Sequence, residues 1–201
     1  GEPSPLVTSG VLLAIVVGIG SQYLPARLPR LLMERFARLP VLGQAAVLAF
    51  AQKLPTHDLL FLPRNISQPK VLSAWVNEID RGAIVSLLAI KGGAVVGCGT
   101  LVRDPHSWSP HVGEIRMVVS QDVRGQGVGR ALSQETFAVA LGAGLEKLSV
   151  QMTVDQQAAI ALFESLGFKA EAPLREHGRG VDGKKHDIAV RGHNVARVGA
   201  W

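Results

Sequence analysis

A glycine-rich turn over residues 124–130 carries the residue types that point most directly to chemistry. An apolar run over residues 112–119 predicts a strand before it, and a helical pattern follows from residue 128. The first N–H groups of a helix have no partner inside the helix, and with the helix dipole they form an anion site. Glycines let the backbone approach an anion closely, and arginines add charged donors, so the turn predicts pyrophosphate binding. The residues concerned are Gly125, Gly127 and Gly129, with Arg124 and Arg130.

Two common nucleotide-binding patterns do not fit this chain. A dinucleotide fingerprint reads G-x-G-x-x-G, whereas the turn has G-x-G-x-G and no acidic residue at the distance expected for a ribose ligand. Residues 178–184 match the first seven positions of a Walker loop, but Lys185 stands where Ser or Thr is required. Both readings are therefore set aside.

Two motifs together resemble one known family. Residues 124–129 (RGQGVG) resemble the [RQ]-x-x-G-x-[GA] signature of the GNAT N-acetyltransferases, and residues 159–168 (AIALFESLGF) resemble the family's second motif, A-x-x-L-Y-x-x-x-G-F. The resemblance covers about residues 57–192. It implies an α/β (α+β) GNAT fold, with a mixed central sheet flanked by helices. It also implies transfer of an acetyl group from acetyl-CoA to a primary amine, by direct attack on the thioester.

The resemblance also assigns roles to particular residues. In the family, acetyl-CoA enters a wedge between two splayed strands, here residues 112–119 and 147–153. The backbone groups of Met117 and Val119 are expected to bind the pantetheine arm, and the Val118 N–H to stabilise the oxyanion. An attacking amine must first lose a proton, and Glu114 is the first candidate for its acceptor and His111 the second. The remaining residues expected to contact the cofactor are Arg124, Gly125, Gln126, Gly127, Val128, Gly129, Arg130, Gln156 and Phe163.

The chain departs from the family pattern at two of these positions. Phe163 replaces the tyrosine that often protonates the departing thiolate, which leaves water or a residue such as Ser165 for that task. Gln156 stands where the family motif often has asparagine, and its longer side chain would reach the cofactor differently. The loss of the tyrosine keeps a second function open, that of a non-catalytic acyl-CoA-sensing module acting through its N-terminal extension.

Histidine and aspartate residues recur at several strand ends. They are too widely spaced to predict a metal site, so hydrogen bonding at strand ends is the interpretation and no metal is expected. These residues are His57, Asp58, Asp155, His177, His186 and Asp187. The single cysteine, Cys98, excludes an intramolecular disulfide, and its apolar surroundings favour a buried structural residue.

Hydrophobic patterning from residue 57 onward predicts mixed helices and strands. The predicted strands are 59–63, 83–90, 94–103, 112–119, 148–153, 168–172 and 186–190, and the predicted helices are 67–79, with Ser67 as its cap, 128–141 and 156–166. This order favours helices packed on a sheet.

Residues 1–56 are predicted to form a helical N-terminal extension, and residues 57–201 the acetyltransferase domain. Helical spacing appears over residues 28–39 and again over 41–54. The apolar run 11–19 is too short for a membrane span, and membrane contact is not expected. The formal net charge of +5 favours anionic partners, but no run of basic residues predicts nucleic-acid binding. The chain is expected to be cytoplasmic and to form a homodimer, because the apolar extension exposes much hydrophobic surface.

Overall fold

The structure is a computed structural model that describes residues 31–35, 41–61, 65–180 and 182–195. Its strands are β1 (Leu31–Arg35), β2 (Ile84–Lys91), β3 (Ala94–Val102), β4 (Val112–Val119), β5 (Lys147–Thr153), β6 (Lys169–Arg179) and β7 (Lys185–Asn194). Its helices are α2 (Val41–Lys53), α3 (Pro69–Asp80), α4 (Val128–Gly142) and α5 (Gln157–Ser165), with short 3-10 helices η2 (Thr56–Phe61) and η3 (Gln121–Val123).

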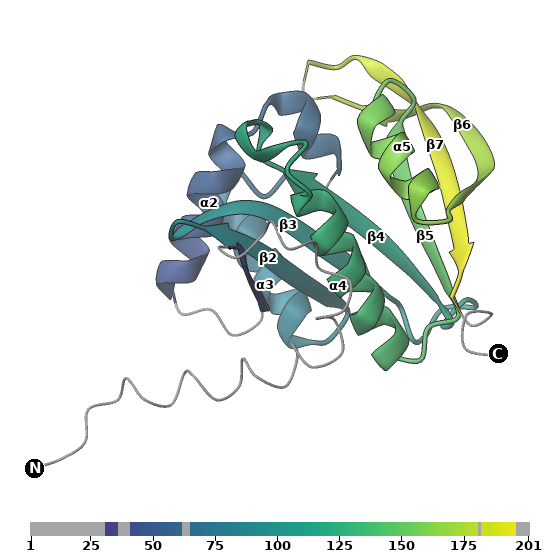
Figure 1. Cartoon of the computed structure of the whole chain (residues 1–201), viewed down its shortest axis with the longest axis horizontal. Helices are drawn as coiled ribbons and strands as arrows, with labels where there is room; N and C mark the ends of the chain where they lie inside the picture. Colours follow the sequence, from purple (N-terminus) through teal and green to yellow (C-terminus); the bar gives the residue numbers. More distant parts are fainter. Residues whose placement is uncertain (1–30, 36–40, 62–64, 181, 196–201) are drawn as a thin grey trace, which may run out of the picture. The chain divides into compact units, whose positions relative to one another are not determined.

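The strands form one mixed sheet in the order β1-β2-β3-β4-β5-β7-β6 (Figure 1). The β4–β5 pair is parallel, whereas β2–β3, β3–β4, β5–β7 and β6–β7 are antiparallel. The predicted class, a mixed central sheet flanked by helices, is therefore confirmed. The parallel pair needs a crossover, and α4 provides it between β4 and β5.

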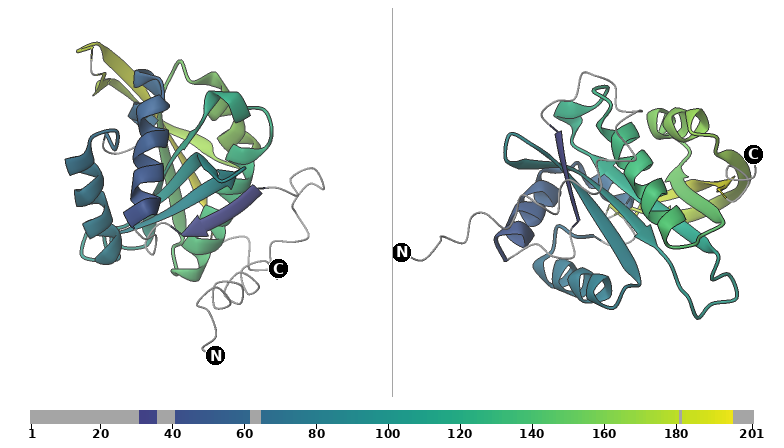
Figure 2. Two further views of the ribbon diagram at one scale, coloured as in Figure 1. Left: turned by 90° about the vertical axis from the view of Figure 1, so that its left-hand side faces the viewer. Right: turned by 60° about the horizontal axis from the view of Figure 1, so that its bottom comes forward.

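Helices cover both faces of the sheet (Figure 2). On β3, an ideal Cβ at Gly99 would lie 3.2 Å from Thr136 Oγ1, so this position faces α4. The neighbouring Cys98 belongs instead to the core formed with α2 and α3, because successive side chains of a strand point to opposite faces. That core includes Phe50 from α2 and Trp75 from α3. Helix α2 thus packs in the same core as the sheet, and the division of the chain after residue 56 stays a prediction.

Two predicted elements are corrected by the structure. Residues 31–35 form strand β1 at an edge of the sheet, although the spacing over 28–39 predicted a helix. Pro29 and Pro40 bound a segment that is too short for a stable isolated helix, while a sheet edge offers ready hydrogen-bond partners. The first residues of the predicted strand 59–63 belong instead to the end of η2. The first turn of η2 is closed by the Asp58 N–H, which donates to the Pro55 carbonyl (2.9 Å).

The remaining predictions differ mainly at element boundaries. Helix α3 begins at Pro69 after Gln68, and Ser67 does not cap it, because the Ser67 hydroxyl donates to Asn65 Oδ1 (2.5 Å). The last two strands are longer than predicted because they pair with each other along an extended hairpin. In the part of the chain that the structure describes, no helix is long and apolar enough to cross a membrane.

Candidate functional site

The pairing between strands β4 and β5 ends halfway along their length. They pair from Val112 opposite Lys147 to Ile115 opposite Val150, and no further. Beyond that point β4 stays paired with β3 up to Val119, and β5 stays paired with β7 up to Thr153. Figure 1 shows the two strands diverging from their joined end. We call this gap, between residues 116–119 and 151–153, the β4–β5 opening; it matches the wedge that the sequence predicted.

The hydrogen-bond alternation of β4 decides which backbone groups face the opening. The Ser120 N–H donates to the Val96 carbonyl of β3 (2.9 Å), so the N–H and C=O groups of every second residue before it also point toward β3. Met117 and Val119 therefore direct their backbone groups toward the opening. The Val118 N–H points toward Cys98 of β3, and the structure does not bring it to the opening as predicted.

The glycine turn joins β4 to α4 beside this opening. Gly125 (φ 72°) and Gly127 (φ 84°) have left-handed backbones, and Gly127 caps α4. At Gly129 an ideal Cβ would lie 3.2 Å from Leu162 Cδ2 of α5, so the glycine allows α5 to approach closely. The first turn of α4 carries no acidic residue, which leaves its N–H groups suited to an anion.

The basic residues predicted at the turn already hold protein partners. Arg124 Nη2 lies 2.5 Å from Oδ2 of the buried Asp58, and the same guanidinium donates to the Val119 carbonyl. Arg130 Nη2 donates to Ser165 Oγ (2.9 Å). Both arginines thus tie the turn to neighbouring segments, η2 in one case and α5 in the other.

Lys91 is a further cation that the sequence analysis missed. It ends β2, and its Nζ donates to Oε1 of Gln126 in the turn (2.6 Å). The Lys-Gly-Gly sequence of residues 91–93 joins the two predicted strands 83–90 and 94–103, and no sequence signal placed this connection beside the turn. The sheet register does so, because Lys91 pairs with Ala94 at the end of β3 that lies beside Val119.

Gln156 and Phe163 occupy different surroundings. Gln156 Oε1 accepts a hydrogen bond from the Thr153 N–H (3.0 Å), whereas its Nε2 is buried with no partner among the described residues. A buried donor without a partner is unfavourable unless a ligand supplies an acceptor. Phe163 is only 5% exposed, and its ring packs edge-on against Phe168 at 5.2 Å.

The structure separates the two predicted proton acceptors. Glu114 lies on β4 just before the opening, with 28% of its side chain exposed, and its Oε1 is 2.5 Å from Arg116 Nε. His111 precedes β4, and its carbonyl accepts the N–H groups of Glu146 and Lys147 at the joined end of the two strands. Met117 lies six residue steps further along the strand, a distance of about 20 Å. His111 is therefore not brought to the opening.

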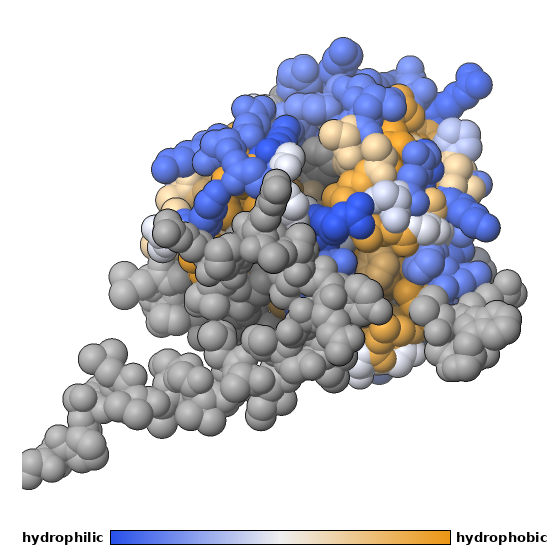
Figure 3. Space-filling view, viewed as in Figure 1, coloured by the Kyte–Doolittle hydropathy of each residue, from blue (hydrophilic) through white to orange (hydrophobic). Residues whose placement is uncertain are grey.

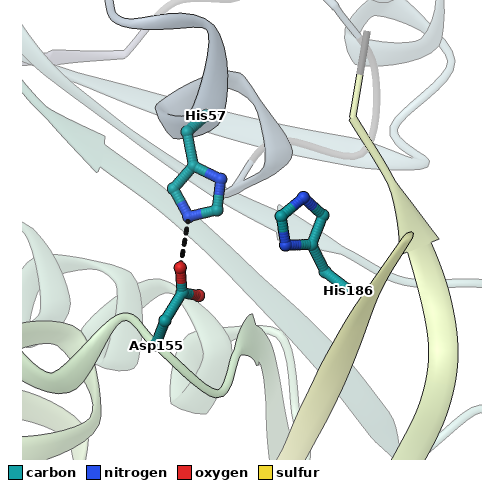
Figure 4. A group of neighbouring side chains, drawn as sticks. All are labelled: His57, Asp155 and His186. Carbon is teal, nitrogen blue, oxygen red and sulfur yellow. Dashed lines mark ion pairs between the residues drawn. The ribbon is translucent and has the colours of Figure 1, made fainter. Parts of the chain in front are cut away.

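A second polar group, predicted only to bond at strand ends, gathers near Thr153 at the end of β5. Asp155 Oδ2 lies 3.3 Å from His57 Nε2, and His186 lies beside them (Figure 4). A hydrogen bond with the Thr153 side chain lowers the pKa of Asp155, as do His57 and His186, against the effect of partial burial. His177 lies on β6, and Asp187 Oδ1 accepts the Glu176 N–H (2.7 Å).

The face drawn in Figure 3 carries polar side chains along its upper rim and apolar ones over α4 and α5. Leu141 on α4 is 54% exposed.

Known proteins are similar to this chain over the region that contains the β4–β5 opening and the glycine turn. A family model described as "Acetyltransferase (GNAT) family" matches residues 53–168. A Mus musculus protein, "Probable N-acetyltransferase family 8 member 5", is 36% identical over 91 residues, which are 44% of this chain and 40% of that protein. The "IAA acetyltransferase" of Azospirillum brasilense is 36% identical over 93 residues, 46% of this chain and 59% of that protein. The matches thus span about half the length of these relatives.

Solved structures share the fold at low sequence identity. A ribosomal-protein-alanine N-acetyltransferase from Brucella melitensis has a TM-score of 0.67 at 22% identity, with coverage of 82% of this chain and 99% of that one. YncA from Salmonella typhimurium, solved with its cofactor acetyl-CoA, has a TM-score of 0.66 at 19% identity. The match covers 82% of this chain and 94% of that one.

Proposed function

The chain belongs to the GNAT family of acetyltransferases, and from this premise we propose that it transfers an acetyl group from acetyl-CoA to a primary amine. The observation that carries the proposal is the β4–β5 opening beside the N-terminus of α4. One segment of β4 is not paired with β5, and the turn that follows presents helix N–H groups and glycines. Few other ligands need both an added strand partner and an anion site within reach of each other.

The residues present fit a CoA thioester. The N–H groups of Gln126, Gly127, Val128, Gly129 and Arg130 would hold the pyrophosphate, with Lys91 as an additional cation beside Gln126. The backbone groups of Met117 and the N–H of Val119 would pair with the pantetheine arm, since the Val119 carbonyl already accepts hydrogen bonds from Arg124. The Gln156 Nε2, which is buried with no partner among the described residues, would donate to the arm as well.

The amine must arrive unprotonated, because a lysine-like amine has a pKa of about 10.4 and is charged at neutral pH. Glu114 remains the proposed proton acceptor, either directly or through water. It lies on the face of the sheet opposite α4, and its carboxylate is held in place by the ion pair with Arg116. The acceptor amine would therefore approach from the side of the sheet that carries α2 and α3.

The departing thiolate has no evident acid among the second-motif side chains. Phe163 has no proton to give, and the Ser165 hydroxyl donates to the Leu162 carbonyl (2.6 Å) while it accepts from Arg130. A thiol pKa of about 8.5 makes a thiolate a fair leaving group without an acid, so transfer remains feasible with water as the proton source. The same observation favours the second candidate function, a module that binds acyl-CoA without turning it over.

Two measurements separate these functions. Isothermal titration calorimetry with acetyl-CoA tests the binding site, and release of free thiol with a panel of primary amines tests transfer. Binding with amine-dependent thiol release supports the enzyme, and binding without release for any amine supports the sensing module. If the wild type bound neither acetyl-CoA nor longer acyl-CoAs, both functions would be refuted. The homodimer and the cytoplasmic location stay predictions, and light scattering over a wide concentration range tests the first.

A further inference from the structure

Three side chains from distant parts of the chain converge at one end of the sheet. His57 comes from η2, Asp155 from the connection between β5 and α5, and His186 from β7. Figure 4 shows the two rings and the carboxylate turned toward one another. The ring centroids of His57 and His186 are 5.1 Å apart, and one donor atom from each of the three residues lies within 4.8 Å of the others.

We propose that His57, Asp155 and His186 bind a divalent transition-metal ion, with Zn²⁺ as the best match. Zn²⁺ takes imidazole nitrogen and carboxylate oxygen, and three protein ligands with one water complete a tetrahedral site. Bonds of about 2.0–2.2 Å at tetrahedral angles put neighbouring donor atoms about 3.3–3.6 Å apart. His57 Nε2 and Asp155 Oδ2 are already 3.3 Å apart.

Small side-chain rotations bring the remaining donors into range. The Asp155 side chain is 61% exposed and the His57 side chain 37%, so neither is locked by packing. The β5–β7 pairing ends at Thr153 opposite Ile188, two residues from Asp155 and two from His186, and beyond it the Val154 N–H donates to the Asp187 carbonyl (3.1 Å). Thr153 Oγ1 lies 3.4 Å from His57 Nε2, a contact that this nitrogen would give up on binding the ion. Two of the three ligands thus lie close to the end of the β5–β7 ladder, and the Asp155 and His57 side chains have room to adjust.

The surroundings leave room for an ion and its water. A cavity of about 480 Å³ lies against the cluster, bordered also by Asp182 and Lys184 from the β6–β7 hairpin. A Cβ at Gly180 would come within 2.5 Å of Asp182 Oδ1 and 3.6 Å of His186 Nε2, so the absence of a side chain keeps this space open. All the side chains that border the cavity carry a polar group, which can hydrogen-bond to the water of a hydrated metal.

The site would tie three segments together beside the β4–β5 opening. Its ligand His57 is followed by Asp58, which pairs with Arg124 of the glycine turn, and Asp155 is followed by Gln156. An occupied site would clamp η2 to the end of β5 and would stabilise the fold as any ligand of the native state does. The proposal does not depend on acetyl transfer, and it differs from the expectation of no metal that the sequence spacing gave.

The test is calorimetric titration of ZnCl₂ into full-length, EDTA-treated protein without a histidine tag. We expect one site per chain, and an affinity at least about 100-fold weaker in His57→Ala and in His186→Ala, because each removes a ligand. Matched controls are His106→Ala and His177→Ala, two exposed histidines outside the cluster, which should bind as the wild type does. Zn²⁺ should raise the Tm of the wild type and the controls but not of the cluster variants.

A second probe keeps the test decisive if a variant folds poorly. Co²⁺ added to the wild type should give the visible absorption of a four-coordinate site, and His186→Gln, which preserves side-chain bulk, should abolish it. The absence of stoichiometric Zn²⁺ binding to the wild type would overturn the proposal. So would equal binding by the cluster and control variants, which would indicate adventitious surface binding.

Discussion

Replacing Gly127 with glutamate should abolish acetyl-CoA binding for a reason that can be separated from strain. Gly127 caps α4 with φ 84°, a conformation that costs an L-residue about 1–2 kcal/mol. The new carboxylate would also stand at the anion site itself. At about 5 Å from one phosphate charge and an effective dielectric constant of about 20, the repulsion is about 3 kcal/mol. That corresponds to a loss of affinity of more than about 100-fold.

Gly144 offers a matched control at the other end of the same helix. Its φ is 73°, and an ideal Cβ there meets nothing within 4 Å. Gly144→Glu should therefore lose a similar free energy of unfolding, measured by urea denaturation, while its acetyl-CoA affinity, measured by calorimetry, stays unchanged. Gly127→Ala, which adds strain without charge, should fall between Gly127→Glu and the wild type. Equal loss of affinity in Gly127→Glu and Gly144→Glu would refute the placement of the anion at the turn.

Three further outcomes follow from contacts in the structure. Arg124→Ala should lower the free energy of unfolding by about 2 kcal/mol, because it leaves the buried Asp58 carboxylate without its ion-pair partner. Adding Asp58→Asn should recover part of that loss, as measured in a double-mutant cycle by urea denaturation. Gln156→Glu keeps an oxygen for the Thr153 N–H but removes the free donor, so acetyl-CoA affinity should fall about tenfold by calorimetry with little change in Tm. Burial raises the pKa of the Cys98 thiol from 9.0 to about 11. The contribution of the neutral thiol to the free energy of unfolding is therefore fully present below pH 9.0, and about 3 kcal/mol is lost as the pH rises toward about 11. Denaturation curves of Cys98→Ala across that pH range should lack this loss.

The exposed apolar surface on α4 bears on the predicted homodimer without deciding it. Leu141 is exposed near the end of the helix, whereas most of the predicted apolar extension lies outside the described residues. A dimer built on α4 would leave the β4–β5 opening accessible only if the partner covers the end of the helix that carries Leu141. Light scattering of Leu141→Glu beside the wild type would show whether this end of α4 is the interface.

The sequence by itself determined those features that depend on short stretches of chain. Glycine content and hydrophobic period placed the turn at 124–130 after a strand and before a helix, and the structure has β4 and α4 at these positions. Positive φ angles at Gly125 and Gly127 are a local requirement that residue type reveals directly. The order of predicted strands and helices favoured helices packed on a sheet, and the family resemblance implied that the sheet is mixed.

Other features were decided only by the tertiary structure, because they join residues far apart in the chain. The sheet register carries Lys91 to Gln126, and it turns the Val118 N–H away from the opening. Strand ends meet to gather His57, Asp155 and His186, which no spacing rule connects. The helical spacing over residues 28–39 was overridden by an available sheet edge. Local pattern sets which conformations a segment favours, but hydrogen-bond partners and neighbouring charges come from segments that only the completed fold brings together.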